Sequence, residues 1–108
     1  MHASIPAYVA LADQCNHPVS ILMQAQPQLP GTLESLHVQQ RRDVLLEVRV
    51  NARGDVTLVK MLQSSHTRDL DTAADRAARN SRYSPAMVDC KPKAGETLFR
   101  VTYDPAQE

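Results

Sequence analysis

The chain has 108 residues, the usual size of a single domain, and 43% of them are hydrophobic, so we expect one buried core and no second domain. Twelve basic and twelve acidic residues cancel, which argues against nucleic acid or another broad polyanion as the partner. No apolar run approaches the ~20 residues that cross a bilayer, and the first residues lack the charged start and apolar stretch of a signal peptide.

The N-terminal part of the chain is rich in proline and shows no regular alternation. We expect residues 1–26 to form an arm that wraps the domain, with one short helix over residues 7–13. Pro27 and Pro30 close the arm, because proline removes amide donors and favours an extended residue before it. The domain itself is expected over residues 27–108, and Thr32 is expected to cap a short helix over residues 33–36.

A β-hairpin is the clearest pattern in the sequence. Apolar and other side chains alternate over residues 44–50, as in a strand with one buried face. Residues 51–54 contain Gly54, which can adopt the positive φ of a short hairpin loop. A second strand is expected over residues 56–62, and its irregular alternation predicts a bulge.

The second half of the chain predicts a helix and a last strand. Thr67 or Asp69 caps the helix and residues 83–86 end it, while a stripe of small apolar residues marks its buried face: Leu70, Ala73, Ala74, Ala77 and Ala78. A polar loop over residues 88–95 leads to a strand over residues 97–103.

These elements predict an α+β fold, with a three-stranded antiparallel sheet, two helices on one face and the N-terminal arm. The expected core lies on the apolar faces of these elements and contains Val44, Val48, Val59, Leu70, Ala74, Ala77, Phe99 and Val101.

Two groups of residues suggest chemistry, and neither is convincing. Ser64, Ser65, His66 and Asp71 supply the residue types of a hydrolase triad, but no nucleophile elbow is present, and short hydroxyls here fit a turn between strand and helix. Cys15, His17 and Cys90 could bind a metal with His37 or His66, but zinc sites usually show two close pairs of ligands. We therefore expect no catalytic residue, no metal and no cofactor.

Cys15 and Cys90 are the only cysteines, and each lies in a polar, proline-containing stretch typical of an exposed loop. Two interpretations stay open from the residues alone: a disulfide that ties the arm to a late loop, or two unrelated thiols.

The order and spacing of five segments resemble the C-terminal domain of TonB-like energy transducers. They are residues 44–50, Gly54-Asp55-Val56, residues 59–65 with their Ser-Ser end, Leu70-Asp71-Thr72-Ala73-Ala74, and Tyr83-Ser84-Pro85-Ala86. The resemblance covers about residues 27–104. The sequence departs from the family at His66, where Gly is usual, and at Arg42-Asp43, which replace a Gly before the first strand.

The resemblance implies a periplasmic protein-binding domain of a Gram-negative bacterium. In that family the domain docks an extended segment of an outer-membrane transporter at its sheet edge for energy-coupled uptake, while an inner-membrane anchor belongs to another part of the protein. The docking strand would be the last one, formed by Leu98, Phe99, Arg100, Val101, Thr102 and Tyr103.

The periplasmic setting, together with the even cysteine count, predicts a disulfide between Cys15 and Cys90. One alternative function is a free-standing periplasmic adaptor or inhibitor that binds a globular partner through the arm and the Cys90 loop. The arm, or the same strand of a second copy in a homodimer, could also cover the sheet edge.

Overall fold

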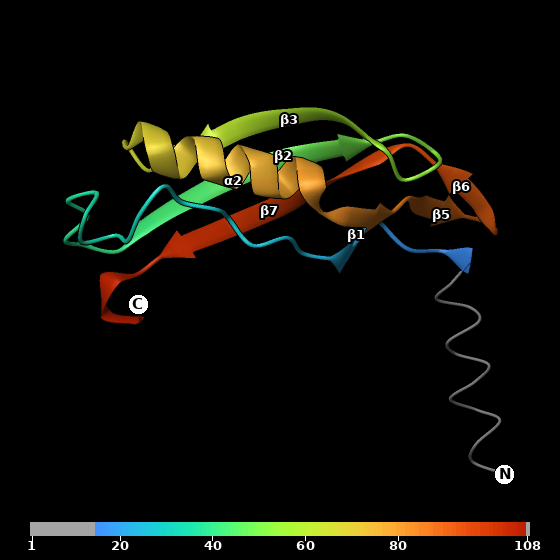
Figure 1. Ribbon diagram of the computed structural model, residues 1–108. Helices are drawn as coiled ribbons and strands as arrows, with labels where there is room; N and C mark the ends of the chain where they lie inside the picture. Colours follow the sequence, from blue (N-terminus) through green and yellow to red (C-terminus); the bar gives the residue numbers. More distant parts are fainter. Residues whose placement is uncertain (1–14, 108) are drawn as a thin grey trace, which may run out of the picture.

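The computed structural model describes residues 15–107, so the helix predicted over residues 7–13 lies outside the described range. At its centre is a three-stranded antiparallel sheet in the order β3-β2-β7 (Figure 1). Its strands are β2 (Arg42–Val50), β3 (Val56–Gln63) and β7 (Gly95–Tyr103). Helix α2 (Arg68–Asn80) packs on one face of this sheet. The predicted hairpin, helix and last strand are therefore confirmed.

The β2–β3 hairpin turns at a loop organised by Asn51. Its side-chain Oδ1 accepts hydrogen bonds from the backbone N–H groups of Arg53 (2.9 Å) and Asp55 (3.0 Å). Gly54 has a φ of 87°, and a Cβ at this position would lie 2.5 Å from the carbonyl oxygen of Tyr83. The pairing of β2 with β3 shifts register twice, as the predicted bulge requires.

The core lies between the sheet and α2. Helix α2 contacts β2 and β3, and the small alanine side chains let helix and sheet approach closely. The buried alternate residues of β7 join those of β2 in the same hydrophobic cluster. Seven of the eight predicted core residues are buried: Val44, Val48, Leu70, Ala74, Ala77, Phe99 and Val101. Val59 is only half-buried, because β3 is an edge strand and Val59 packs at the margin of the core.

Residues 15–33, which we call the strap, lie in an extended course along the helix side of the domain (Figure 1). Within the strap, β1 (Ser20–Met23) pairs antiparallel with β4 (Arg82–Ser84). Further along, the Ala25 N–H donates to Ser81 Oγ at 2.9 Å. Val19 and Leu33 are buried in the same hydrophobic cluster as the sheet and the helix. The strap is therefore packed on the domain along its length.

The prediction of a second helix, over residues 33–36, is wrong. Residues 33–37 form a turn, and α2 is the one α-helix among residues 16–107. Thr32 does cap this turn, because its Oγ1 accepts a hydrogen bond from the Ser35 N–H at 3.0 Å. A helical segment this short gains too few hydrogen bonds to propagate, and His37 ends it with a φ of 62°.

The prediction of a polar loop over residues 88–95 is also wrong, because a small hairpin occupies most of this segment. Strands β5 (Ala86–Val88) and β6 (Lys91–Lys93) pair antiparallel. The turn residues Asp89 and Cys90 have φ values of 52° and 64°, as a two-residue hairpin turn with two left-handed positions demands. The helix ends at Asn80, so residues 82–84 belong to β4, and a short 3₁₀ helix, η1 (Pro105–Gln107), follows β7.

Candidate partner-binding edge

Strand β7 is an edge of the main sheet, and within residues 15–107 it pairs only with β2. Its ladder runs without a register shift from the pair Arg42–Tyr103 to the pair Val50–Gly95. In an antiparallel ladder, alternate residues direct their N–H and C=O groups away from the partner strand. The outer side of β7 therefore presents a regular row of backbone donors and acceptors.

The side chains of the predicted docking strand alternate as expected. Phe99, Val101 and Tyr103 are buried on the helix side of the sheet, whereas Leu98, Arg100 and Thr102 lie on the opposite face. Leu98 is 55% exposed, although it is a large apolar side chain. One face of β7 thus belongs to the core, and the other is free to contact a partner.

Charged and polar groups cluster near the C-terminal half of β7. Thr102 Oγ1 donates to Asp43 Oδ1 at 2.8 Å, and Arg41 Nε lies 3.5 Å from the same oxygen. The hydrogen bond from Thr102 is the main reason that the pKa of the Asp43 carboxyl is lowered, and the positive charges of Arg41 and Arg100 act in the same direction. Asp43 therefore stays ionised and holds Thr102 and Arg41 in place.

A groove of about 650 Å³ lies between this half of β7 and the strap. One wall is formed by residues 100–103 of β7 and by Asp104, and the strap contributes Gln24, Gln26, Pro27 and Leu29 to the other wall. The lining mixes apolar side chains with amides and charged groups, as sites for polypeptides and small ligands do. Sequence reasoning missed the strap wall, because no pattern in these residues shows what they face.

The other open edges are less suited to strand addition than β7. The pairing of β3 with β2 shifts register twice, and such bulges twist an edge away from a flat geometry. Strand β6 is fully exposed and consists of Lys91-Pro92-Lys93, residue types that commonly protect an edge from pairing. The segment 97–103 of β7 contains no proline and a single charged residue, Arg100.

Tyr103 fixes the end of β7 to the helix. Its hydroxyl donates to the Leu70 carbonyl oxygen in the first turn of α2, at 2.9 Å. Burial is the main cause that raises the pKa of Tyr103 to about 12, and the nearby charge of Asp71 adds to it. The phenol is therefore neutral at every physiological pH and keeps this hydrogen bond.

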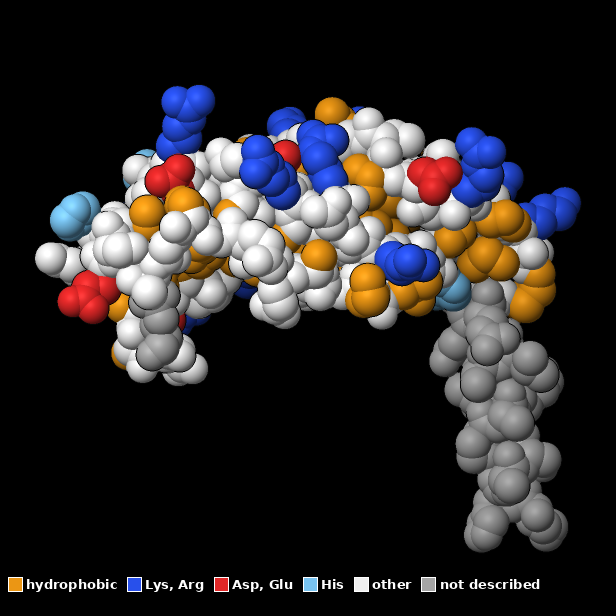
Figure 2. Space-filling model, in the orientation of Figure 1, with side chains coloured by type: hydrophobic (Ala, Val, Ile, Leu, Met, Phe, Trp, Pro, Cys, Tyr) orange, Lys and Arg blue, Asp and Glu red, His pale blue; other side chains and the backbone are white. Residues whose placement is uncertain are grey.

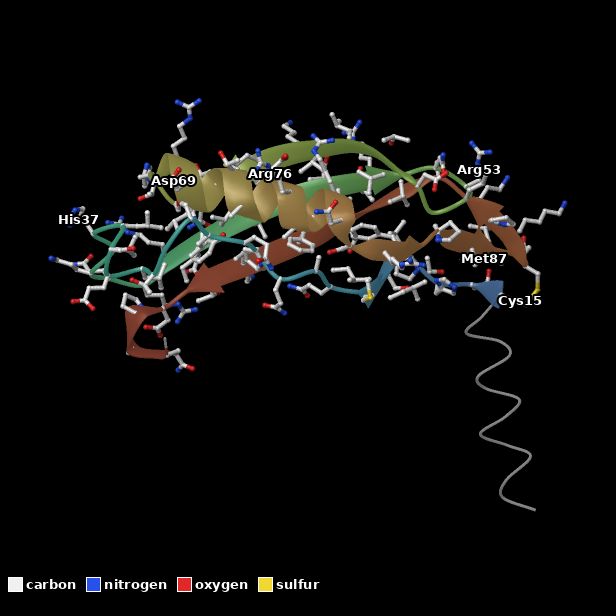
Figure 3. The ribbon with its side chains drawn as sticks, viewed as in Figure 1. Cys15, His37, Arg53, Asp69, Arg76 and Met87 are labelled. Atoms are coloured by element: carbon white, nitrogen blue, oxygen red, sulfur yellow. A yellow bond between two sulfur atoms is a disulfide. The ribbon has the colours of Figure 1, made fainter. Side chains whose placement is uncertain are left out.

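The predicted disulfide between Cys15 and Cys90 is confirmed, and it joins the start of the strap to the β5–β6 turn. The Cys90 N–H also donates to the Cys15 carbonyl oxygen at 2.9 Å, and the Asp89 N–H donates to Asn16 Oδ1 at 3.0 Å. Beside them, His17 and Met87 exchange two backbone hydrogen bonds. Figure 3 shows Cys15 and Met87 at the end of the molecule opposite to His37, so His37 cannot join the cysteines in a metal site.

Of the four residues considered for a hydrolase triad, Ser64, Ser65 and His66 lie between β3 and α2, and Asp71 lies in the first turn of the helix. Ser65 is 2% exposed, and its Oγ and N–H donate to Asp71 Oδ1 at 2.6 and 2.9 Å, while Ser64 Oγ donates to Asp71 Oδ2. Burial raises the pKa of Asp71, but these hydrogen bonds outweigh it and lower the pKa overall. His66 donates its backbone N–H to Ser64 Oγ. The cluster thus closes the link between strand and helix, as the turn interpretation predicts.

The described residues contain no candidate membrane-spanning helix and no candidate metal site. Within residues 15–107, no helix combines the length and the apolar character needed to cross a bilayer. In the same part of the chain, no group of three or more His, Cys, Asp or Glu side chains could hold a metal ion.

Comparison with known proteins gives a consistent result. The family model described as Gram-negative bacterial TonB protein C-terminal matches residues 34–105, which contain the whole of the main sheet and α2. Two similar relatives are both named Protein TonB and come from Xanthomonas campestris pv. campestris, strains B100 and ATCC 33913. Each is 39% identical over 61 residues, or 56% of this chain and 27% of the relative. The matched part therefore spans about a quarter of the length of these relatives.

Proposed function

Since the chain belongs to the family of TonB C-terminal domains, we propose that its β7 edge docks an extended segment of an outer-membrane transporter for energy-coupled uptake. The family's domain is periplasmic and serves energy transduction in transport, and the family is not one of enzymes. The observation that carries the proposal is the regular, unshifted ladder of β7 at the edge of the sheet, beside the groove. Membrane attachment, on this proposal, belongs to a part of the protein outside this chain.

Strand addition would extend the sheet by one strand. Backbone groups of the partner would pair with the outward N–H and C=O groups of β7 and supply affinity without regard to sequence. Arg100 and Thr102 alternate away from the core, so they would choose among partners through their side chains. Leu98 offers the partner an apolar contact on the same face.

A titration followed by NMR tests the docking. Isotope-labelled protein is mixed with short peptides from the periplasmic ends of outer-membrane transporters, with scrambled peptides as controls. We expect the largest amide shifts at residues 98–103. We also expect Arg100→Glu to change the preference among peptides, whereas Arg53→Glu, at the exposed hairpin loop, should leave it unchanged.

One observation favours the alternative of an adaptor that binds a globular partner. Hydrophobic side chains gather at the end of the molecule that carries β5 and β6 (Figure 2), where Val88 is 49% exposed. Amide shifts confined to the strap and the β5–β6 turn, with residues 98–103 unmoved by every binding peptide, would rule out edge docking and support the adaptor. Pairing of β7 with a second copy would instead appear as concentration-dependent shifts without any peptide.

A further inference from the structure

The groove beside β7 has two walls, and they differ in origin. One wall is the edge of β7 itself, which lies within the matched family region. The other is the strap, which precedes that region and reaches the groove with Gln24, Gln26 and Pro27. The strap wall therefore lies outside the matched region, at the place where the partner is proposed to bind.

The wall segment of the strap is held at both of its ends and at one point between them. On the N-terminal side, the Cys15–Cys90 disulfide, the His17–Met87 pair and the β1–β4 ladder fix it to the domain. On the C-terminal side, Leu33 is buried in the core. Between these points, the bond from Ala25 N–H to Ser81 Oγ connects it to the end of α2.

Residues in this segment alternate in exposure. Ala25, Pro27 and Leu29 are half-buried against the domain, whereas Gln24, Gln26 and Gln28 are exposed. Gln24 and Gln26 line the groove on the β7 side, and Gln28 lines a separate hollow on the α2 side. A side-chain amide can both donate and accept, so Gln24 and Gln26 can bond the free backbone groups of an extended strand.

We infer that the strap is the second wall of the partner site, and that the Cys15–Cys90 disulfide holds this wall in its binding position. The inference rests on the proposed docking at β7. The ligand is an extended polypeptide strand that pairs with β7 on one side and receives hydrogen bonds from Gln24 and Gln26 on the other. Opening the bridge loosens the strap while Val19 and Leu33 stay buried, so Gln24 and Gln26 hold their binding position for only part of the time.

The main test compares peptide affinity with the bridge closed and open. The probe is whichever transporter peptide shifts the β7 amides of the wild-type protein. Dithiothreitol supplies two electrons and two protons to the bridge, leaves two thiols and becomes a cyclic disulfide. If Gln24 and Gln26 then hold their binding position about a tenth of the time, the apparent Kd rises about tenfold. The variant Cys15→Ser with Cys90→Ser should show the same weaker binding and no response to the reductant.

A matched pair of variants decides the question even where the cysteine variant fails to fold. Gln26→Ala should weaken binding of the same peptide several-fold, whereas Gln28→Ala, on the other side of the strap, should not. Equal affinities for both variants, or tighter binding once the bridge is open, would overturn the inference while shifts at residues 98–103 still upheld docking at β7. Absence of those shifts in the wild-type protein would instead overturn the proposed function.

Discussion

Removing the disulfide should destabilise the whole domain. The bridge joins residues separated by 75 positions. In the chain-entropy model, closing a loop of this size restricts the unfolded chain enough to stabilise the fold by about 4.5 kcal/mol at 25 °C. The free energy of unfolding of the whole domain includes this full amount only if the strap unfolds together with the sheet. We expect this, because Val19 and Leu33 are buried in the same cluster as β2, β7 and α2.

Urea denaturation of the wild type and of Cys15→Ser with Cys90→Ser measures the effect. The free energy of unfolding should fall by roughly 4 kcal/mol. The m-value should rise, because an unfolded chain without the bridge exposes more surface. The reduced wild-type protein serves as the control and should match the variant. A loss under about 1 kcal/mol with an unchanged m-value would refute the reasoning, since it would mean that the strap opens independently of the sheet.

Three further predictions concern the fold that supports β7. Leu70→Ala removes a fully buried side chain between helix and sheet, so the free energy of unfolding from chemical denaturation should fall by about 2–5 kcal/mol. A fall of less than about 0.5 kcal/mol would show that the helix face is misassigned. Because the pKa of Tyr103 is about 12 in the folded protein and ~10 in the unfolded chain, its contribution to stability is complete below pH ~10. That contribution is lost as the pH rises to about 12, and Tyr103→Phe should flatten this part of a stability-against-pH curve; an unchanged curve would contradict the assignment. Gly54→Ala combines a strained positive φ with a Cβ 2.5 Å from the Tyr83 carbonyl oxygen, so it should lower the thermal midpoint. Ala52→Gly, in the same loop, is the control and should lower the thermal midpoint less.

The parts of the fold that follow a simple period could be predicted from the sequence. Val44, Leu46, Val48 and Val50 alternate because one face of β2 is buried, and the alanine stripe of α2 repeats because one helical face packs on the sheet. The position of β7 at an edge also follows, since a hairpin formed by the first two strands leaves the last strand one neighbour.

What the sequence could not predict depends on tertiary context. The β5–β6 hairpin turns at Asp89-Cys90, which lacks the Gly or Asn-Gly signal of such a turn, and the disulfide and the bond to Asn16 hold its left-handed residues instead. The strap pairs and packs through contacts with residues more than fifty positions away, and its own sequence does not show which residues those are. The second wall of the groove could therefore not be predicted from the sequence.

The disulfide also shortens the mechanical path through the molecule. Tension on the chain ahead of residue 15 would cross the bridge from Cys15 to Cys90 and reach Gly95, the first residue of β7, through the few residues of β6. The strap, β2, β3 and α2 would carry little of that load, because the covalent bridge bypasses them. Force would then enter β7 at Gly95, and a partner strand pulled from the opposite end of β7 would be loaded in shear. In that geometry the hydrogen bonds between the two strands would resist the load together, whereas a partner pulled from the Gly95 end would lose them one at a time.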